Sequence, residues 1–351
     1  MKVMDIKLNS HQYKIFFKRN ILNEVPQYLK DHFSSKRIAI ITDHNVRKLY
    51  GEGLLKDISD TGFEAKIISI RPGEESKNLN TLEKVYGQLS ALGITRGDLI
   101  ITMGGGVTGD LGGFAAATYL RGVPYIQIPT SLLAQVDSSI GGKVAVDLPW
   151  GKNLVGSFYH PEAVFIDPQV LSTLDKRFFS DGIAEVIKYG CIMDETIINS
   201  LMNLKGLEDE SMDSLIYKCC GIKKILVEKD ERDFGERMLL NFGHTLGHGV
   251  EKYYDYKRFT HGEAVAIGMA HITRNTEILG ITEPGTVKRL EEVLEKFELP
   301  STTPDMEMEK VYDAINLDKK NSSGFISIIV ITKIGNGIIK KIEKSKISDY
   351  I

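Results

Sequence analysis

Residues 97–120 of the chain read GDLIITMGGGVTGDLGGFAAATYL, and this stretch sets the architecture of the first half. The apolar run ending at Met103 predicts a buried strand, and the small residues from Leu111 onward predict a helix. Glycines at 104–106 allow backbone N–H groups to approach an anion, and the helix start adds a partial positive charge. The stretch therefore predicts a turn that can hold the diphosphate of a dinucleotide, although a tight turn without a ligand has the same pattern.

Two features of this segment differ from the usual dinucleotide fingerprint. The turn follows a middle strand instead of the first one, and no acidic residue ends the strand YIQIPT about 20 residues further on. Asp43 ends the apolar run RIAIIT and lies close to Asn45, so it is the candidate for binding a ribose, although Asp-x-Asn is also common in plain turns. The loop PGEESK at 72–77 follows the next strand and either contacts the same ligand or only caps a helix.

Short apolar runs alternate with helical stretches through the first half of the chain. The runs are RIAIIT, FEAKIISI, GDLIITM, YIQIP and AVFID, and the opening MKVMDIKLNSHQYKIFF alternates like a pair of strands. Long helical segments follow after about residue 170, and then one apolar run, FISIIVITKIGNGIIKKI, predicts a hairpin. We therefore expect an α/β fold with a Rossmann-like, doubly wound sheet domain over residues 1–170 and a mainly α-helical domain over 171–351.

The composition is that of an ordinary globular protein. Hydrophobic residues make up 42% and charged residues 26% of the 351 positions. A net charge of -3 provides no basic surface for nucleic acid or an anionic membrane, and no apolar run is long enough to span a bilayer. Three cysteines without a CxxC pair are typical of a reducing compartment. We expect a cytoplasmic protein that binds neither nucleic acid nor membrane.

Polar side chains recur through the apolar segment RMLLNFGHTLGH at Arg237, Asn241, His244 and His248. Their spacing of four, three and four residues predicts one helix that carries all of them on the same face. A single buried histidine is usually a satisfied core residue, but burying four polar groups without a partner costs free energy. The stripe therefore indicates a polar site or a metal site.

Two histidines four residues apart can share a metal ion. The segment HTLGH lacks the Glu of the HExxH metallopeptidase motif, which argues against peptide hydrolysis. A catalytic zinc site needs a third protein ligand. The candidates are His261, which opens HGEAVAIGM, and Glu185 in GIAEVIKYG, with Lys188 one turn later. Each of these taken alone is more simply a structural residue.

Basic residues gather in a glycine-rich context that suits a phosphate or a carboxylate. The segment AQVDSSIGGKVAVDLPWGKNLVGSF holds Asp137, Lys143, Lys152 and Asn153. Arg121, just after the glycine-rich helix, is expected at the same carboxyl end of the sheet. Lys223 and the triplet at 318–320 add charge from the second half. Any one lysine alone is more simply a solvated surface charge.

Several of these segments resemble the signature sequences of 3-dehydroquinate synthases, in the same order. They are GGGVTGDLGGFAAATYLRG, PTSLLAQVDSSIGGKVAVDLPWGKNLVGSF, AEVIK, LNFGHTLGHGVE, HGEAVAIGM and DKK. The resemblance implies a first domain that binds NAD, a second domain that binds a zinc or cobalt ion and the substrate, and a homodimer. Asp233 departs from it, because the family commonly has Glu there.

The resemblance also implies roles for particular residues, and it changes the metal site that spacing suggested. Glu185, His244 and His261 would bind the metal, and His248 would lie one turn away. The residues implied to contact substrate or take part in catalysis are Arg121, Asp137, Lys143, Lys152, Asn153, Lys188, Lys223, Asp233, Arg237, Asn241, His248 and either Lys319 or Lys320. The residues implied to surround NAD are Asp43, Asn45, Glu74, Lys77, Gly105, Gly106, Val107, Asp110, Thr130, Ser131 and Thr173, together with Asp137, Lys143 and Lys152.

The activity implied is that of a carbon-oxygen lyase of the shikimate pathway, on the way to chorismate and the aromatic amino acids. NAD would oxidise 3-deoxy-arabino-heptulosonate 7-phosphate at C5, and phosphate loss, re-reduction, ring opening and an intramolecular aldol closure would give 3-dehydroquinate. Glycerol and iron-dependent alcohol dehydrogenases share the scaffold but need no lysine-rich phosphate site. Cyclases that make deoxyinosose or valiolone differ mainly in the pocket, and a nucleotide-binding scaffold protein would not require the metal ligands.

Overall fold

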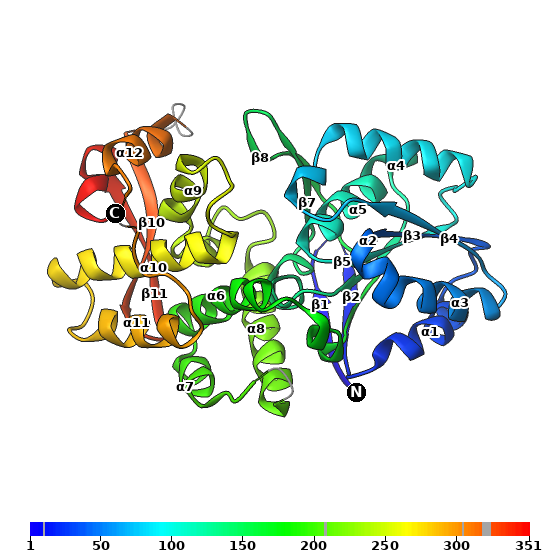
Figure 1. Ribbon diagram of the computed structural model, residues 1–351, viewed down its shortest axis with the longest axis horizontal. Coiled ribbons are helices and arrows are strands. Elements are labelled where there is room, and N and C mark those ends of the chain that lie inside the picture. The colour runs from blue at the N-terminus through cyan, green and yellow to red at the C-terminus, as the bar shows by residue number, and fades with distance from the viewer. Residues whose placement is uncertain (10, 207–208, 304, 318–323) are drawn as a thin grey trace. The chain divides into compact units, whose positions relative to one another are not determined.

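The computed structural model of the chain describes residues 1–9, 11–206, 209–303, 305–317 and 324–351, without the side chains of 313–317. The chain divides into two compact units, Met1–Leu174 and Asp175–Ile351 (Figure 1). The first is an α/β unit and the second is mainly helical, which confirms the expected fold class. Within the described ranges, every helix falls short of the length and apolarity that crossing a membrane requires.

The first unit alternates strands and helices along the chain. Its elements are β1 (Lys2–Lys7), β2 (Gln12–Phe17), η1 (Ile21–Glu24), α1 (Val25–His32), β3 (Arg37–Asp43), α2 (His44–Val46), η2 (Arg47–Gly51), α3 (Glu52–Asp60), β4 (Glu64–Ile70), η3 (Glu74–Ser76), α4 (Leu79–Ala91), β5 (Leu99–Gly104), α5 (Gly106–Thr118), η4 (Tyr119–Arg121), β6 (Tyr125–Pro129), η5 (Ala134–Ser138), β7 (Lys143–Leu148), β8 (Gly151–Phe158), β9 (Ala163–Ile166) and η6 (Pro168–Thr173).

Seven of the described strands build one large sheet in the order β1-β2-β9-β6-β5-β3-β4. All neighbours pair in parallel except β1 and β2, the expected strand pair at the start of the chain. Alternate residues of β3 belong to different cores: Ala39 and Ile41 pack with α4 and α5, whereas Ile38 and Ile40 pack with α1 and α3. Because both faces are covered by helices, these strands read as continuous apolar runs.

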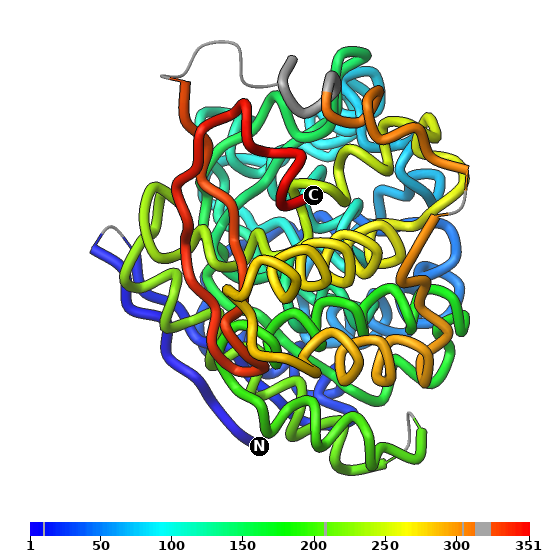
Figure 2. Tube along the Cα trace, turned by 90° about the vertical axis from the view of Figure 1, so that its left-hand side faces the viewer, coloured from blue at the N-terminus to red at the C-terminus, as the bar shows by residue number. Residues whose placement is uncertain are grey.

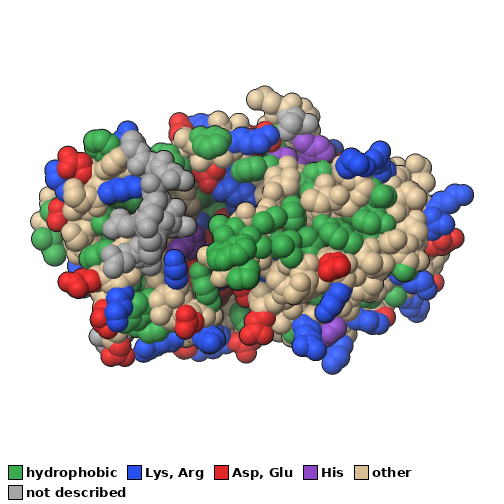
Figure 3. Space-filling model, turned by 90° about the horizontal axis from the view of Figure 1, so that it is seen from above, with side chains coloured by type: hydrophobic (Ala, Val, Ile, Leu, Met, Phe, Trp, Pro, Cys, Tyr) green, Lys and Arg blue, Asp and Glu red, His purple; other side chains and the backbone are tan. Residues whose placement is uncertain are grey.

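A β-hairpin formed by β7 and β8 was not predicted from the sequence. Its strands pair antiparallel, apart from the large sheet, and α5 packs on β7. Glycine and charged residues interrupt its apolar pattern, which is why the period of a strand is hard to recognise there. In the face drawn in Figure 3, hydrophobic side chains gather over the first unit. Trp150 in the turn of this hairpin is 79% exposed.

The second unit consists mainly of helices. Its elements are α6 (Lys176–Ile192), α7 (Glu195–Asn203), α8 (Glu210–Lys229), η7 (Glu236–Asn241), α9 (His244–Tyr253), α10 (His261–Ile278), α11 (Thr286–Lys296), α12 (Met308–Leu317), β10 (Phe325–Lys333), β11 (Asn336–Glu343) and η8 (Lys344–Asp349). The expected hairpin of β10 and β11 is present, with its turn at 334–335. Figure 2 shows the two strands of this hairpin side by side, and β10 packs against α10.

The predicted single helix through Arg237 and His248 is wrong. A 3-10 turn, η7, ends at Asn241, and α9 begins only at His244. Gly243 between them has φ of 79°, and a Cβ there would lie 2.7 Å from the carbonyl oxygen of Val265 in α10. The backbone needs glycine here because the turn is left-handed and presses against a neighbouring helix. The four polar side chains therefore come from two elements.

Close packing of α5 on the sheet predicts opposite effects of two Gly→Ala substitutions. A Cβ on Gly112 would lie 2.6 Å from Cγ2 of buried Thr102, so Gly112→Ala should destabilise the protein by about 1–3 kcal/mol through overpacking. Gly87 in α4 is exposed and its Cβ would meet nothing within 4 Å. Gly87→Ala should stabilise the protein by roughly 0.5–1 kcal/mol through helix propensity. Urea unfolding would measure the change in the free energy of unfolding for both variants. Equal changes would contradict the close packing of Gly112 against Thr102.

Candidate functional site

The predicted dinucleotide residues follow the carboxyl ends of neighbouring strands. Strands β4, β3, β5 and β6 are adjacent and parallel, so these ends share one edge of the sheet. Asp43 ends β3, Glu74 and Lys77 follow β4, Gly105 follows β5, and Thr130 follows β6. Ligands of open α/β sheets bind at this edge.

The start of α5 has the form that suits an anion. Gly105 is its N-cap and offers no side chain to cap the helix, so the first N–H groups have no side-chain partner from that residue. A Cβ on Gly105 would lie 3.3 Å from Oγ of Ser131, and Thr130 donates its N–H to the carbonyl oxygen of Gly104 at 2.9 Å. The glycine turn and the loop after β6 therefore lie against each other, with partly exposed backbone.

Asp43 also has the purely structural role that the sequence allowed. Its Oδ1 accepts from the N–H groups of Asn45 and Val46 at 2.8 and 3.1 Å, which caps α2. Its side chain is buried at the strand end. Binding of a ribose by Asp43 and Asn45 stays a prediction.

Lys77 joins three parts of this edge. Its ammonium lies 2.6 Å from Oδ2 of Asp110 and 3.8 Å from Oε1 of Glu74. Burial by itself would lower the pKa of Lys77, but the charges of Asp110 and Glu74 outweigh it and raise that pKa. The carbonyl oxygen of Lys77 accepts from the N–H of Asp147 in β7, and Asp147 accepts from the N–H of Asn153. This network ties the glycine-rich helix to the β7–β8 hairpin.

The remaining predicted residues of the first unit lie on several elements. Val107 is in the first turn of α5, Asp137 is in η5, Lys143 opens β7, Lys152 and Asn153 are in β8, and Thr173 ends η6. Oγ1 of Thr173 lies 2.6 Å from the hydroxyl of Tyr50. The expectation that Arg121 lies at the carboxyl end of the sheet is wrong. Because α5 returns antiparallel to β5, Arg121 lies at the amino end, just before β6.

Three elements of the second unit bring together Glu185, His244 and His261. Glu185 lies in α6, His244 begins α9, and His261 begins α10, as its place in the sequence predicted. Oε1 of Glu185 is 3.6 Å from Nε2 of His244 and 3.8 Å from Nε2 of His261. These ligand atoms all lie within 4.8 Å of one another. The arrangement can hold a metal ion.

The carboxylate of Glu185 is the buried member of this set, with 1% of its side chain exposed. Neither of its oxygens receives a hydrogen bond of normal geometry within the described part of the chain. The ammonium of Lys188, one turn later in α6, forms an ion pair with it. A buried carboxylate with so few donors is costly unless a cation is close.

Nδ1 of each histidine has its own acceptor. Nδ1 of His244 lies 3.1 Å from the carbonyl oxygen of Phe242, and Nδ1 of His261 lies 3.4 Å from Oε2 of Glu251. Glu251, in α9, is buried and was not predicted. Its position three residues after His248 would have placed it on the same helical face. The N–H of Gly262 donates to Asp181, a second carboxylate near His261 that was missed.

The two histidines have opposite electrostatic surroundings. Burial lowers the pKa of His244 well below its usual value, and the positive charges of Lys188 and the neighbouring histidines lower it further. Burial also acts to lower the pKa of His261. A hydrogen bond to Glu251 and the charges of Glu251, Glu185 and Asp181 outweigh it and raise that pKa to about 9. Three carboxylates therefore favour a cation at or beside His261.

Other predicted residues of the second unit include three buried cations on mutually packed elements. Lys188 in α6, Lys223 in α8 and Arg237 in η7 are each less than 5% exposed. Asn241 and His248 are exposed, and the His248 ring lies 5.5 Å from that of His244. Asp233 has φ of 64° in the turn before η7. Lys319 and Lys320 lie outside the described residues.

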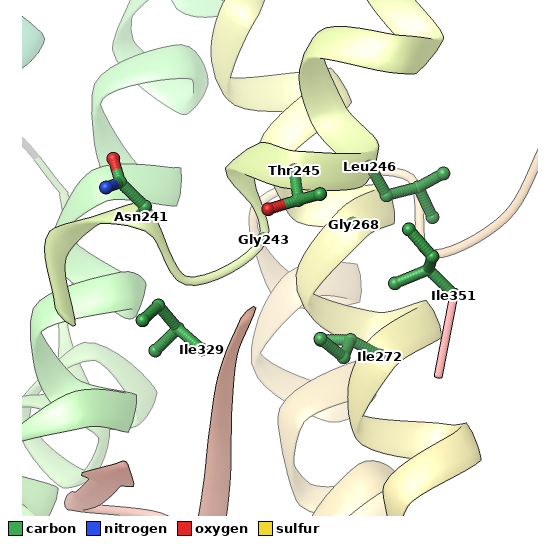
Figure 4. Close-up of a pocket in the computed structure, with 8 residues that line it drawn as sticks. All are labelled: Asn241, Gly243, Thr245, Leu246, Gly268, Ile272, Ile329 and Ile351. Carbon is green, nitrogen blue, oxygen red and sulfur yellow. The ribbon is translucent and has the colours of Figure 1, made fainter. Parts of the chain in front are cut away.

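A pocket near the start of α9 is lined mostly by apolar side chains. It is lined by Asn241, Gly243, Thr245, Leu246, Gly268, Ile272, Ile329 and Ile351 (Figure 4). Two of these residues carry polar side chains, and none carries a charged one. Such a lining does not suit a phosphorylated sugar acid, so we do not place the substrate there.

The fold is similar to the solved structures of several enzymes. The chain is similar to 2-deoxy-scyllo-inosose synthase complexed with carbaglucose-6-phosphate, NAD+ and Co2+, with a TM-score of 0.88 and 25% identity over 99% of this chain and 98% of that one. A second similar structure is a 2-epi-5-epi-valiolone synthase from Streptomyces hygroscopicus with NAD+ and Zn2+ bound. Its TM-score is 0.88, and it is 26% identical over 97% of this chain and 96% of that one. Butanol dehydrogenase A of Thermotoga maritima, 15% identical over 96% of each chain with a TM-score of 0.67, shares the fold. The class is that of the sugar phosphate cyclases.

Sequence relatives identify the family within this class to which the chain belongs. Residues 67–181 match the family described as 3-dehydroquinate synthase N-terminal, and residues 182–321 match 3-dehydroquinate synthase C-terminal. The chain is 56% identical to the 3-dehydroquinate synthase of Clostridium kluyveri, over 100% of this chain and 98% of that one. It is 51% identical to the 3-dehydroquinate synthase of Clostridium acetobutylicum, over 100% of this chain and 99% of that one. The chain belongs to the 3-dehydroquinate synthase family, and it is a phosphate-eliminating cyclase that acts on a phosphorylated sugar.

The surroundings of His261 predict how the metal-free protein titrates. His261 should have a pKa near 9, and His244 should stay neutral at neutral pH. Because the folded chain holds the His261 proton more tightly, this proton stabilises the fold fully below the unfolded pKa of about 6.5, and the effect is lost as the pH rises through about 9. NMR titration of the imidazole signals, assigned with His261→Ala, measures both values. A His261 pKa at or below 6.5 would contradict the role of the carboxylates.

Proposed function

We propose that the chain converts 3-deoxy-arabino-heptulosonate 7-phosphate to 3-dehydroquinate and phosphate with one divalent metal ion and NAD. The observation that supports this proposal most strongly is that Glu185, His244 and His261 come together in a chain of this family. The reaction consists of transient oxidation at C5, phosphate elimination, re-reduction, ring opening and aldol closure. NAD is regenerated in each cycle.

The metal would be zinc or cobalt, held by Glu185, His244 and His261. Bonds of about 2.0–2.2 Å to a tetrahedral ion separate the ligand atoms by roughly 3.4 Å. The separations of 3.6 and 3.8 Å from Oε1 of Glu185 to the two Nε2 atoms are close to this value. The buried carboxylate and the two Nε2 atoms therefore fit such an ion. When bound, it supplies a Lewis acid that makes a substrate hydroxyl more acidic.

NAD would bind at the carboxyl edge of the sheet in the first unit. The uncapped start of α5 and the loop after β6 suit its diphosphate, and Asp43, Glu74 and Lys77 suit its ribose groups. When bound, it supplies a hydride acceptor that returns the hydride later in the cycle.

The chain's own cations would bind the charged groups of the substrate. Lys188, Lys223 and Arg237 are buried on elements that pack against one another, so they gather positive charge in one part of the second unit. A substrate that carries a phosphate and a carboxylate suits such a group of cations. Lys143, Lys152 and Asn153 of the hairpin are proposed to orient the phosphate. His248, exposed beside the other imidazoles, is proposed to hold or move a proton.

We also propose that the enzyme is a homodimer in the cytoplasm. The three cysteines are buried and form no disulfide, as suits a reducing compartment. The exposed hydrophobic side chains over the first unit (Figure 3) suit a surface between two copies.

The reaction can be tested with the metal-loaded protein, NAD and the heptulosonate phosphate. Phosphate release and NADH absorbance should be followed together. We expect phosphate in amounts equal to the substrate consumed and no lasting NADH, because NAD is regenerated. Steadily accumulating NADH would indicate a dehydrogenase instead. Phosphate released only from glucose 6-phosphate would indicate a deoxyinosose-type cyclase.

The proposed metal ligands predict that removing one of them causes a large loss of zinc binding and of turnover. Glu185→Gln and His261→Ala should each lose most zinc binding, measured by equilibrium dialysis, and lower kcat by at least about 100-fold. His271→Ala is the matched control, since His271 lies in the same helix, α10, but outside the ligand set. If the control loses as much zinc as His261→Ala, the metal lies elsewhere.

A further inference from the structure

A buried carboxylate, Glu251, lies at the opposite nitrogen of the same imidazole that faces Glu185. Only 2% of the Glu251 side chain is exposed, and its Oε2 is 3.4 Å from Nδ1 of His261. Nε2 of His261 is 3.8 Å from Oε1 of Glu185. One imidazole is therefore held between two carboxylates, each at a different ring nitrogen.

The chemistry of the acceptors decides which nitrogen carries the hydrogen in the neutral ring. An ionised carboxylate accepts hydrogen bonds and cannot donate them, so Nδ1 of His261 donates to Glu251. The carbonyl oxygen of Phe242 imposes the same choice on His244, at 3.1 Å from its Nδ1. Both rings then present the lone pair of Nε2 toward Glu185. The two histidines have matching tautomers, one set by a backbone carbonyl and the other by Glu251.

We propose that Glu251 is a positioning residue of the metal site. By accepting the hydrogen bond from Nδ1 of His261, Glu251 holds the ring with Nε2 toward Glu185 and increases the basicity of that nitrogen. This role rests on the proposed binding of a metal by Glu185, His244 and His261. The position of Glu251 supports it, because α9 carries both His244 and Glu251 and therefore orients two ligands at once.

A competing arrangement makes Glu251 a ligand itself. His248, Glu251 and His261 also offer ligand atoms within 4.8 Å of one another. If Nδ1 of His261 bound an ion there, it could not donate to Glu251, and two ions would share a single imidazole. The number of ions bound per chain separates the two arrangements.

Metal binding of the full chain tests the proposal without reference to turnover. Metal-free wild type, Glu251→Gln, Glu251→Ala and Glu292→Gln would be titrated with Zn2+ against a chelator and with Co2+ by visible absorption. Glu292 is an exposed carboxylate of α11 in the same unit and serves as the matched control. Circular dichroism would confirm that each variant is folded, and the isosteric Gln variant keeps the test valid if the Ala variant unfolds.

We expect one ion per chain in all four proteins. Zn2+ affinity should fall about 10-fold in Glu251→Gln and about 100-fold in Glu251→Ala, with an altered Co2+ spectrum and no change in the control. Unchanged affinity in the Gln variant, and in the Ala variant where it folds, would overturn the proposal. Two ions in wild type and one in Glu251→Ala would also overturn it, by making Glu251 a ligand. Unchanged affinity in Glu185→Gln would instead refute the metal site itself, and the positioning role with it.

Discussion

The burial of the Glu185 carboxylate is the constraint on which the second unit depends. A lone negative charge in the middle of a packed helix is unstable unless cations or strong donors surround it. Lys188 supplies one charge from the same helix, and His244 and His261 approach from α9 and α10. That approach requires close backbone contact between these helices. Gly243 and Gly268 permit it, since a Cβ on Gly268 would lie 2.0 Å from the carbonyl oxygen of Gly243.

The carboxyl edge of the first unit presents charge in a different way. This edge offers backbone N–H groups at an uncapped helix start, and the buried Lys77, which forms ion pairs with Asp110 and Glu74, holds the surrounding loops in place. Backbone dipoles suit a diphosphate that is held throughout a catalytic cycle. The second unit instead buries whole charges. Its buried cations, Lys188, Lys223 and Arg237, suit the phosphorylated sugar on which a phosphate-eliminating cyclase acts.

Sequence patterns predicted the elements better than they predicted the contacts. Continuous apolar runs identified the parallel strands. The helix expected to open at His261 does begin there, and the structure shows Thr260 capping it by accepting from the N–H of Glu263. The spacing through 237–248 failed, because residue periodicity assumes an unbroken helix and the chain turns at Gly243. Spacing within a helix could have pointed to Glu251, but only its contact with Nδ1 of His261 gives that carboxylate a role.

The sequence by itself determined the fold class, the order of the two units, the glycine turn before α5 and the resemblance to one enzyme family. These follow from local periodicity, turn residues and long matching segments, all of which act along the chain. Only the tertiary structure gave the burial of Glu185, its distances to His244 and His261, and the contact of Glu251 with His261. The physical reason is that ligand geometry and burial depend on the packing of helices distant in sequence. No spacing along one helix encodes that packing.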